Sequence, residues 1–343
     1  MEQSIGGVDN LTHHGRIRCL MWFMTVKRPL PGMEPTGPFG TRAAANSGYS
    51  TRVLRRLEAQ CLGKGVWSWS LAEVNGVPEG LSGTALARWI APFLETNQGV
   101  AASLWTAARL WELPVWDRGD RRIHVLRPDS AADLTRPFVE AHRARLLPGE
   151  VCWFGGVPVT TPARTWLDLA AVVTLDELVA VGDACVRIPR PEFEPRKGPH
   201  ATPEELRAVV RGHRGKRGIS SARAALELVR VGADSPQETL LRLAFERAGF
   251  PEPLLNPRVA VSGTGEEFQP DLAFPEYRIG VEYDGEHHSA AAQVGRDIRR
   301  AEKYARAGWL EVRLSKEHTV DDHRLAIRKV RDALISRGWR KAA

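Results

Sequence analysis

Three carboxylates in the last third of this 343-residue chain have the spacing of a metal-binding site. Asp271 precedes an apolar run that ends at Pro275, and Glu282 and Asp284 lie at the end of the next run. Apolar residues alternate with others in both runs, which predicts two half-buried strands joined by a tight turn. Such a hairpin brings Asp271 opposite Glu282, and Asp284 projects to the same face two residues later. Like charges gathered in this way need a cation, and carboxylate oxygens suit Mg²⁺ or Mn²⁺.

The expected strand register follows from the position of the turn. If the chain turns at Glu276–Tyr277, Phe274 pairs with Ile279, and the pairing continues outward to the carboxylates. Val259–Val261 provides an earlier strand. The sequence therefore predicts three strands, with the acids at one end of a hairpin.

A predicted helix before these strands carries a fourth acid. Ser235 can act as its N-cap, Pro236 occupies the first turn, and Glu238 is the third helical residue. Apolar positions continue this helix to Gly249. Three further elements are predicted after the acids, a helix, a strand and a last helix: Val294–Arg306, Trp309–Leu314 and Asp321–Arg337. The order of this region is α-β-β-β-α-β-α.

This order and its acids resemble the PD-(D/E)XK nuclease superfamily, and most closely the branch similar to very-short-patch repair (Vsr-like) endonucleases. That branch shows an Asp, an apolar strand ending in E-x-D-G-x-x-H, then D-x-x-R and a G-W-x-V-x-R strand. The resemblance covers about the last third of the chain. After Asp271, the matching residues stand here in the same order: Glu282, Asp284, Gly285, His288, Asp297, Arg300, Gly308, Trp309, Val312 and Arg313.

The resemblance implies a restriction-endonuclease-like domain over residues 203–343 that hydrolyses phosphodiester bonds, with DNA as the expected substrate. Asp271, Glu282 and Glu238 are then the expected ligands of Mg²⁺ or Mn²⁺. His288 is the expected general base, because the unperturbed pKa of imidazole is about 6.5. The expected catalytic residues are Glu238, Asp271, Glu282, Asp284 and His288.

Two features differ from the family. The position of the superfamily's lysine is Asp284, so another cation must stand beside the scissile phosphate. His288, Arg300 and Lys303 are left open as alternatives for that role. The repair endonucleases also carry a structural zinc. No zinc is expected here, because all four cysteines precede the domain: Cys19, Cys61, Cys152 and Cys185.

The composition favours a polyanionic partner. The net charge is +7 and the isoelectric point is about 9.5. Basic residues gather on the helix that follows the acids, and three of them are expected to contact nucleic acid: Arg299, Arg300 and Lys303. Lysine and arginine neutralise the phosphates of DNA and RNA alike, and the resemblance to the nuclease family implies double-stranded DNA as the partner.

The cysteines and apolar segments favour a cytoplasmic location. Four cysteines without a C-x-x-C pair form neither a disulfide framework nor a metal knuckle. The apolar run Cys19–Val26 is shorter than the roughly 20 residues of a membrane span. It also lacks the small-residue cleavage site of a signal peptide. Residues 1–37 are expected to be a disordered leader, and no membrane partner is expected. The chain has no P-loop and no G-x-G-x-x-G motif.

Residues 38–75 have the element order of a winged helix-turn-helix. Thr41–Ser47 predicts a first helix, and Ser50 or Thr51 caps a second one. Val66–Trp69 then alternates like a strand. Three arginines decorate the outer face of the second helix and are expected to contact DNA: Arg52, Arg55 and Arg56. The alternative is a helical hairpin packed on the middle domain, with these arginines in solvent.

Residues 84–187 predict an α+β middle domain, followed by a proline-rich linker at 188–202. Its predicted elements are a helix, a strand, a hairpin and two helices: Leu86–Leu113, Arg122–Leu126, Val151–Phe154 with Val157–Thr160, Ala163–Ala171 and Leu175–Arg187. With its segment VPVTTPARTWLDLA, this region resembles the middle region of type IV abortive-infection antitoxin-like proteins. The winged helix in front of it fits that family as well.

Several polar residues of the middle domain allow two interpretations. One is a polar site, and the other is a set of buried ion pairs that tie strand to helix. The second is favoured for these four residues: His142, Arg143, Arg164 and Asp168. His124, on an apolar strand, is likewise expected to be structural.

Two functions remain in competition. The first is a Mg²⁺-dependent endonuclease that acts in repair or in defence against foreign DNA. The second is a non-catalytic DNA-binding regulator of the type IV antitoxin kind, with an inactive nuclease fold and a toxin as partner. The absent lysine favours the regulator. Retention of Asp271, Glu282 and Asp284 favours the nuclease, because an inactive site gains nothing from mutually repelling acids.

Overall fold

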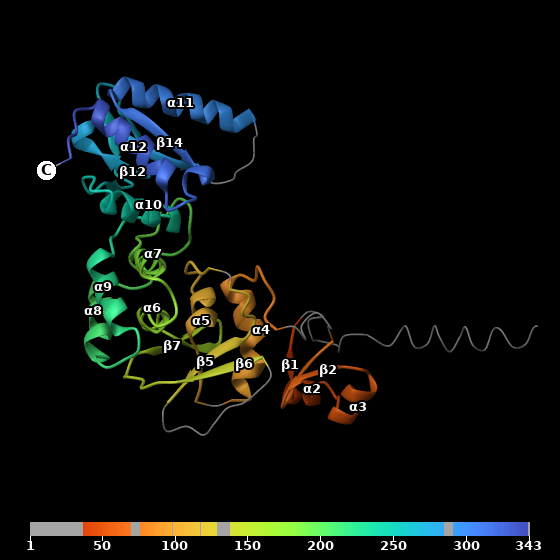
Figure 1. Ribbon diagram of the computed structural model, residues 1–343. Coiled ribbons are helices and arrows are strands. Elements are labelled where there is room, and N and C mark those ends of the chain that lie inside the picture. The colour runs from red at the N-terminus through yellow and green to blue at the C-terminus, as the bar shows by residue number, and fades with distance from the viewer. Residues whose placement is uncertain are drawn as a thin grey trace, which may run out of the picture. The chain divides into compact units, whose positions relative to one another are not determined.

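The structure is a computed structural model, and the chain forms a mixed α/β fold (Figure 1). The residues that it describes are 37–69, 76–97, 99–116, 118–128, 138–284 and 291–341, with only the backbone for 291–297. These residues form sheets of three, two, four and five strands. The described residues divide into two compact units. The first unit takes those within 1–106 and 117–160, and the second unit takes those within 107–116 and 161–343. No helix in these ranges is long and apolar enough to cross a membrane.

The first unit begins with two short helices, α2 (Thr41–Asn46) and α3 (Thr51–Arg56), and a three-stranded sheet of order β1-β3-β2. The strands are β1 (Phe39–Gly40), β2 (Gln60–Gly63) and β3 (Val66–Ser68). Ser50 caps α3 as predicted, because its Oγ accepts a hydrogen bond from Val53 N at 3.4 Å. Leu54 and Trp67 are buried in a small apolar core, whereas the three arginines of α3 are exposed, as expected.

The rest of the first unit is built on a five-stranded sheet of order β6-β5-β4-β8-β7. Its strands are β4 (Ala101–Ala102), β5 (Ile123–Arg127), β6 (Val139–Arg143), β7 (Val151–Phe154) and β8 (Val157–Thr160). The predicted hairpin of β7 and β8 is confirmed. Gly155 and Gly156 have φ values of 55° and 85° in its turn. Two successive positive φ angles are typical of the turn that matches strand twist, and glycine adopts them without strain.

The single helix predicted over Leu86–Leu113 is wrong. The structure has two helices there, α4 (Gly83–Glu95) and α5 (Leu104–Leu110), with strand β4 between them. Gly99 adopts a φ of 79°, which a helix cannot contain. The apolar residues on both sides are buried against the sheet, so their spacing resembled one continuous helical face.

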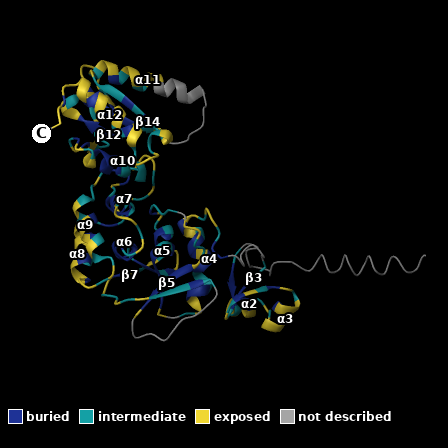
Figure 2. Ribbon diagram, in the orientation of Figure 1, coloured by how far each residue is buried: buried dark blue, intermediate teal, exposed yellow. Residues whose placement is uncertain are grey.

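Five helices open the second unit. They are α6 (Pro162–Leu169), α7 (Leu175–Val186), α8 (Pro203–Gly212), α9 (Ile219–Leu228) and α10 (Pro236–Arg247). The outer sides of α8 and α9 are exposed (Figure 2). The sequence grouped α6 and α7 with residues 84–187, but the compact unit groups them with the C-terminal half of the chain. The reason lies in packing, because Asp183 of α7 and Arg242 of α10 form a completely buried ion pair.

Residues 188–202 contain no helix or strand, yet ion pairs hold them in place. Glu194 accepts from Arg187 at 2.7 Å, and Arg190 pairs with Asp234, close to the start of α10. Phe193, by contrast, is 80% exposed. This segment, called the pinned loop below, is therefore held by ion pairs to the rest of the second unit. The boundary between the two compact units lies elsewhere in the chain.

A four-stranded sheet of order β14-β13-β12-β9 forms the centre of the C-terminal part. Its strands are β9 (Leu254–Leu255), β12 (Leu272–Phe274), β13 (Ile279–Asp284) and β14 (Leu310–Ser315). The predicted register is confirmed, since Phe274 pairs with Ile279. The predicted strand at Val259–Val261 exists as β10, but it pairs with β11 (Glu266–Phe268) in a separate ribbon. Strand β9 takes the expected place beside β12.

Helices cover the two faces of this sheet differently. Helices α10 and α12 (Arg324–Ser336) pack on one face, where their apolar residues join Phe274, Val281 and Leu314 in a common core. Helix α11 (Ala291–Ala307) lies on the other face (Figure 1). Side chains alternate between faces along a strand, so the residues between these core positions point toward α11. The carboxylates of interest belong to that second set.

Candidate functional site

Asp271 and Glu282 face each other at the end of the β12–β13 hairpin. The register pairs Leu272 with Val281, so the next pair outward is Asp271 with Glu282. Asp271 Oδ2 accepts a hydrogen bond from Tyr283 N at 2.7 Å, which fixes the carboxylate across the strand gap. The hairpin therefore brings the two acids together as the sequence predicted.

Glu282 is held by two side chains of α11. Its Oε1 accepts a hydrogen bond from the Tyr304 hydroxyl at 2.7 Å, and its Oε2 lies 3.2 Å from Arg300 Nη1. The residue is only 6% exposed. Gly280 allows this approach, because a Cβ there would overlap the Tyr304 ring and hydroxyl. The glycine in the strand thus lets Tyr304 reach the carboxylate two residues further along.

The electrostatics of this pair disfavour two full negative charges. Burial, and then the charge of Asp271, raise the pKa of Glu282 to about 7. Burial also raises the pKa of Asp271, against the opposing effects of Tyr283 N–H and the Arg300 cation. Both carboxyls are therefore harder to ionise than ordinary ones, and a nearby cation would relieve the repulsion between them.

Glu238 is the third helical residue of α10 and holds the start of that helix together. Its carboxylate accepts hydrogen bonds from Asp234 N at 2.9 Å, Ser235 Oγ at 2.8 Å and Asn256 Nδ2 at 2.6 Å. Burial, and then Asp271, raise its pKa to about 7. Glu238 is thus within the electrostatic reach of Asp271, while three donors from the chain already occupy its oxygens.

Of the other two expected catalytic residues, the structure describes Asp284 but not His288. Asp284 ends β13 and is exposed, and its charge contributes to raising the pKa of Asp271. His288 lies outside the described residues. Within the described ranges, no group of three or more His, Cys, Asp or Glu side chains is arranged to hold a metal ion. The structure therefore brings together a pair of acids with two further acids in electrostatic range.

The basic residues of α11 differ in what they contact. Arg300 reaches Glu282. Lys303 donates to the carbonyl oxygen of Glu267 at 3.1 Å, away from the acid pair, and Arg299 is exposed. Of the two described candidates for the missing lysine's role, Arg300 and Lys303, Arg300 is therefore the one that the structure brings to the carboxylates.

Sequence reasoning missed Tyr304 and Asn256 as site residues. Tyr304 lies four residues after Arg300, so both point from the same side of α11, and this spacing was a usable signal. Asn256 follows β9 and connects three parts of the site, since it bonds Glu238 and Arg190 as well as Gly232 O. No local sequence pattern marks such a residue, because its partners are distant in the chain.

The polar residues of the middle region belong to two different compact units. Arg164 and Asp168 pair within α6, in the second unit, at 3.0 Å and with almost no exposure. His142 belongs to the first unit, where its Nε2 lies 3.0 Å from His124 Nδ1. His124 Nε2 lies 3.1 Å from Asp120 Oδ2. These contacts are not the predicted buried ion pairs from strand to helix: Arg164 and Asp168 pair within one helix, His142 and His124 lie on neighbouring strands, and Arg143 is exposed.

His124 is expected to make the first unit sensitive to acid. Burial lowers its pKa from 6.5 to about 4, an effect that the neighbouring His142 and Arg122 increase and Asp120 opposes. The unfolded chain binds a proton near pH 6.5, whereas the folded chain does not. The contribution of His124 to the free energy of unfolding is therefore fully present above pH 6.5. It decreases as the pH falls to about 4, by up to about 3 kcal/mol.

Urea unfolding between pH 4 and 7 tests this expectation. The difference in unfolding free energy between wild type and His124→Gln should shrink as the pH falls through that window. A difference that stays constant with pH would mean that His124 takes up its proton equally in both states.

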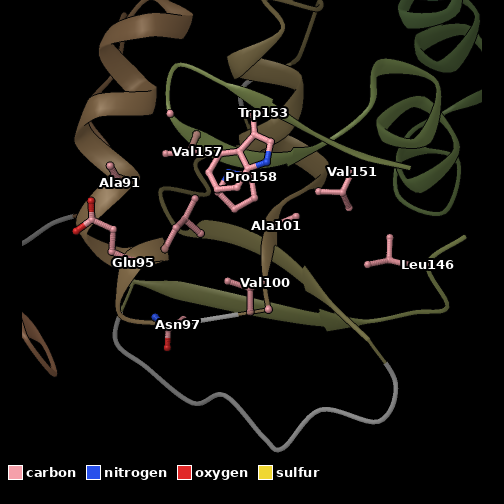
Figure 3. A pocket seen from close by; sticks show the side chains of 13 residues that line it. Ala91, Glu95, Asn97, Val100, Ala101, Leu146, Val151, Trp153, Val157 and Pro158 are labelled. Carbon is pink, nitrogen blue, oxygen red and sulfur yellow. The ribbon is translucent and has the colours of Figure 1, made fainter. Parts of the chain in front are cut away.

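A separate apolar pocket of about 470 Å³ lies in the first unit. Trp153, 73% exposed, stands beside Val157 and Pro158 at one side of it, and Glu95 and Asn97 lie at another (Figure 3). None of the expected site residues lines this pocket. The pocket and the acid pair are therefore different features of the chain.

Comparison with known proteins gives limited information. No protein-family model matches the chain. Two uncharacterized proteins of Mycobacterium tuberculosis, one from strain CDC 1551 / Oshkosh and one from strain ATCC 25618 / H37Rv, are each 31% identical to it over 166 residues. The match covers 48% of this chain and 56% of each relative, so the chain spans about half the length of these curated relatives. Their names state no activity.

Proposed function

We propose that this chain is a metal-dependent nuclease that hydrolyses phosphodiester bonds of double-stranded DNA. The observation that carries the proposal is the facing pair of half-buried Asp271 and buried Glu282, with raised pKa values and with Arg300 at its edge. Strongly shifted carboxyl pKa values cluster at functional sites. Burying like charges together destabilises a protein, so such an arrangement is typical of a site whose function requires it.

The acid pair is chemically suited to a divalent cation. Both groups offer hard carboxylate oxygens, and Asp271 Oδ1 carries no hydrogen bond within the described residues. Asp271 and Glu282 would hold Mg²⁺ or Mn²⁺, with Glu238 acting through water because its oxygens already accept three hydrogen bonds. A cation there would supply charge neutralisation at the scissile phosphate and acidify bound water.

The neighbouring side chains then have distinct roles. Tyr304 orients Glu282 through its hydroxyl. Arg300 lies where its guanidinium can stabilise negative charge that develops on the phosphate, the task of the missing lysine. Asp284 completes the set of acids or orients His288, which acts as the base for the attacking water.

The element order supports the proposed nuclease family. Apart from the separate β10–β11 ribbon, the helix α10, strands β9, β12 and β13, helix α11, strand β14 and helix α12 follow the order α-β-β-β-α-β-α. This order, with Asp271 and Glu282 on adjacent strands, supports a PD-(D/E)XK fold of the Vsr-like kind. Helices α2 and α3 with the small sheet support a winged helix-turn-helix in front of it. Action in repair or in defence against foreign DNA is part of the same proposal.

A second candidate is the non-catalytic regulator of the type IV antitoxin kind. The observation that favours it is the engagement of the acids by the chain itself. Glu282 bonds Tyr304 and Arg300, and Glu238 bonds three donors, as an inactive site filled by structural contacts would. In that case the chain binds DNA through α3 and a toxin elsewhere, without cleavage.

A cleavage assay separates the two candidates. Purified protein is incubated with supercoiled plasmid, mismatched and branched duplexes, single-stranded DNA and RNA, each with Mg²⁺, Mn²⁺ or EDTA. The nuclease proposal expects cleavage of duplex DNA with either metal and none in EDTA. Binding of duplex DNA without cleavage under every condition would support the regulator.

Both candidates expect α3 to bind DNA phosphates. Arg52, Arg55 and Arg56 are exposed on that helix. The slope of log affinity against log salt is negative, and its magnitude falls by about 0.9 for each phosphate contact removed. Replacing all three with glutamine is therefore expected to make the slope shallower by up to about 2.7. Fluorescence anisotropy with a labelled duplex, across a salt series, measures it.

A control removes the same charge elsewhere. Glutamine at Arg207, Arg211 and Arg223, on the exposed sides of α8 and α9, should change the slope by less than about 0.9. If the α3 variant keeps the wild-type slope, α3 makes no phosphate contact, and its arginines are only solvated.

A further inference from the structure

The second unit contains a polar cavity of about 280 Å³ that is distinct from the acid pair. Its walls come from residues 112–114, from α7, from the pinned loop 188–202 and from the start of α10. The volume corresponds to roughly nine water molecules, at about 30 Å³ each. It is therefore large enough for a small polyatomic ion with some of its hydration.

Arg196 is the side chain in this cavity whose hydrogen bonding is incomplete. Its Nη1 atom is buried and has no hydrogen-bond partner among the described residues. Its Nη2 atom lies 3.5 Å from Glu194 Oε2, a long contact. Glu194 is already bound by Arg187, at 2.6 Å and 2.7 Å. The carboxylate of Glu194 is thus shared between two guanidinium groups, and its contact with Arg196 is longer than its contacts with Arg187.

The charge around Arg196 agrees with this geometry. Burial and the neighbouring Arg187 lower the pKa of Arg196 below the ordinary range for arginine, because Glu194 does not fully compensate them. His200 also lines the cavity, and burial together with Arg196 and Arg187 lowers its pKa to about 4, so its ring is neutral at pH 7. The carboxylate beside Arg196 is thus Glu194, which Arg187 holds more closely, and Glu112 also lines the cavity.

The acids in the cavity wall have their own partners. Asp183 accepts from Thr239 Oγ1 at 2.9 Å and from Arg242 Nη2 at 3.1 Å. Asp234 pairs with Arg190. Arg242 also has two buried donors, Nε and Nη1, without a hydrogen-bond partner among the described residues, but neither Arg242 nor Arg190 lines the cavity, whereas Arg196 does. A missing hydrogen-bond acceptor, preferably anionic, is what this arrangement calls for.

We propose that this cavity binds a phosphate group through Arg196, with Arg187 contributing its charge. A guanidinium with a buried free N–H matches a phosphate oxygen in geometry and charge. The phosphate belongs either to a small free anion or nucleotide, or to the end of a nucleic-acid strand. The proposal does not depend on catalysis at Asp271 and Glu282.

Calorimetric titration in EDTA tests the proposal without any contribution from cleavage. Inorganic phosphate is added to the full chain at constant ionic strength, with chloride as the balancing anion. Saturable binding is expected for wild type. Arg196→Gln is expected to weaken it by at least about tenfold, the scale of a hydrogen bond to a charged group. Arg207→Gln, a change of the same type on exposed α8, should bind as wild type does.

Two outcomes would overturn the proposal: no saturable heat with wild type, or equal binding by wild type and Arg196→Gln. Arg196→Lys guards against a folding defect, because it keeps the charge and should recover part of the affinity. The source of the phosphate follows from two further ligands, adenosine monophosphate and a 5′-phosphorylated duplex compared with its 5′-hydroxyl form. An Arg196-dependent preference for the phosphorylated duplex identifies a strand end, and equal affinity for the two duplexes identifies a small anion.

Discussion

Asp271→Asn is expected to abolish DNA cleavage while the protein stays folded. The change removes one of the two facing carboxylate charges and keeps nearly the same shape. Loss of a single electrostatic group at an active site slows catalysis by roughly 10²–10³-fold or more, and here the lost group is also a proposed metal ligand. Nicking of supercoiled plasmid with Mn²⁺, followed over time, measures the loss.

The same variant should not lose stability in the absence of metal. Asp271 is the second-largest cause of the raised pKa of Glu282, after burial. With an amide at position 271, the pKa of Glu282 should move down from about 7 toward the ordinary glutamate range, because one repelling charge is gone. Thermal unfolding in EDTA should therefore show a melting temperature equal to or above that of wild type.

Added Mn²⁺ separates a metal site from a structural cluster. Mn²⁺ should raise the melting temperature of wild type and leave that of Asp271→Asn unchanged. Asp332→Asn, at an exposed position of α12, is the control and should behave as wild type in every assay. If Asp271→Asn is destabilised equally with and without Mn²⁺, and wild type cuts no nucleic acid, the acids are structural and the regulator takes the nuclease's place.

The acid pair could be predicted from the sequence because it depends on local geometry. Strand alternation on both sides of Pro275, with the turn that follows it, determines which residues face each other, and the pairing of Phe274 with Ile279 follows directly. The contacts that hold Glu282 could not be predicted in the same way. Tyr304 reaches it from 22 residues away, and the approach depends on how α11 packs over Gly280.

Long-range contacts shape two segments in a way that the sequence interpretation did not include. Apolar spacing predicted one helix over Leu86–Leu113, which is wrong, and a proline-rich composition predicted a linker at 188–202. Strand β4 joins the five-stranded sheet, and Arg187 and Arg190 bind acids that hold the loop. Neither kind of contact leaves a periodic signal in the chain.

Asp183→Asn is expected to destabilise the second unit by about 3–5 kcal/mol. Asp183 and Arg242 are 1% and 0% exposed, and their ion pair joins α7 to α10. Asp183 also accepts hydrogen bonds from Arg230 N at 2.7 Å and from Thr239. Asparagine keeps one acceptor but leaves the buried guanidinium with only the half-exposed Glu246, 4.0 Å away, as a counter-charge. Urea unfolding monitored by circular dichroism measures the cost.

The same two helices provide a matched control. Asp176 of α7 pairs with Arg247 of α10, but these side chains are 31% and 55% exposed. Solvent screens such a pair, so Asp176→Asn should cost less than about 1 kcal/mol. Equal costs for Asp176→Asn and Asp183→Asn would mean that burial does not govern the strength of the connection between α7 and α10.

A double variant shows what the buried pair contributes. Burial raises the pKa of Asp183 in spite of the nearby Arg242, so the protein bears a large desolvation cost to keep this charge. Replacing both partners by apolar residues, Asp183→Leu with Arg242→Met, removes that cost together with the attraction. Because leucine leaves Arg230 N and Thr239 Oγ1 without their acceptor, the double variant should recover part of the stability that Asp183→Asn loses. Recovery would mean that the pair serves to fix how α7 meets α10, the helix that carries Glu238, more than to stabilise the fold.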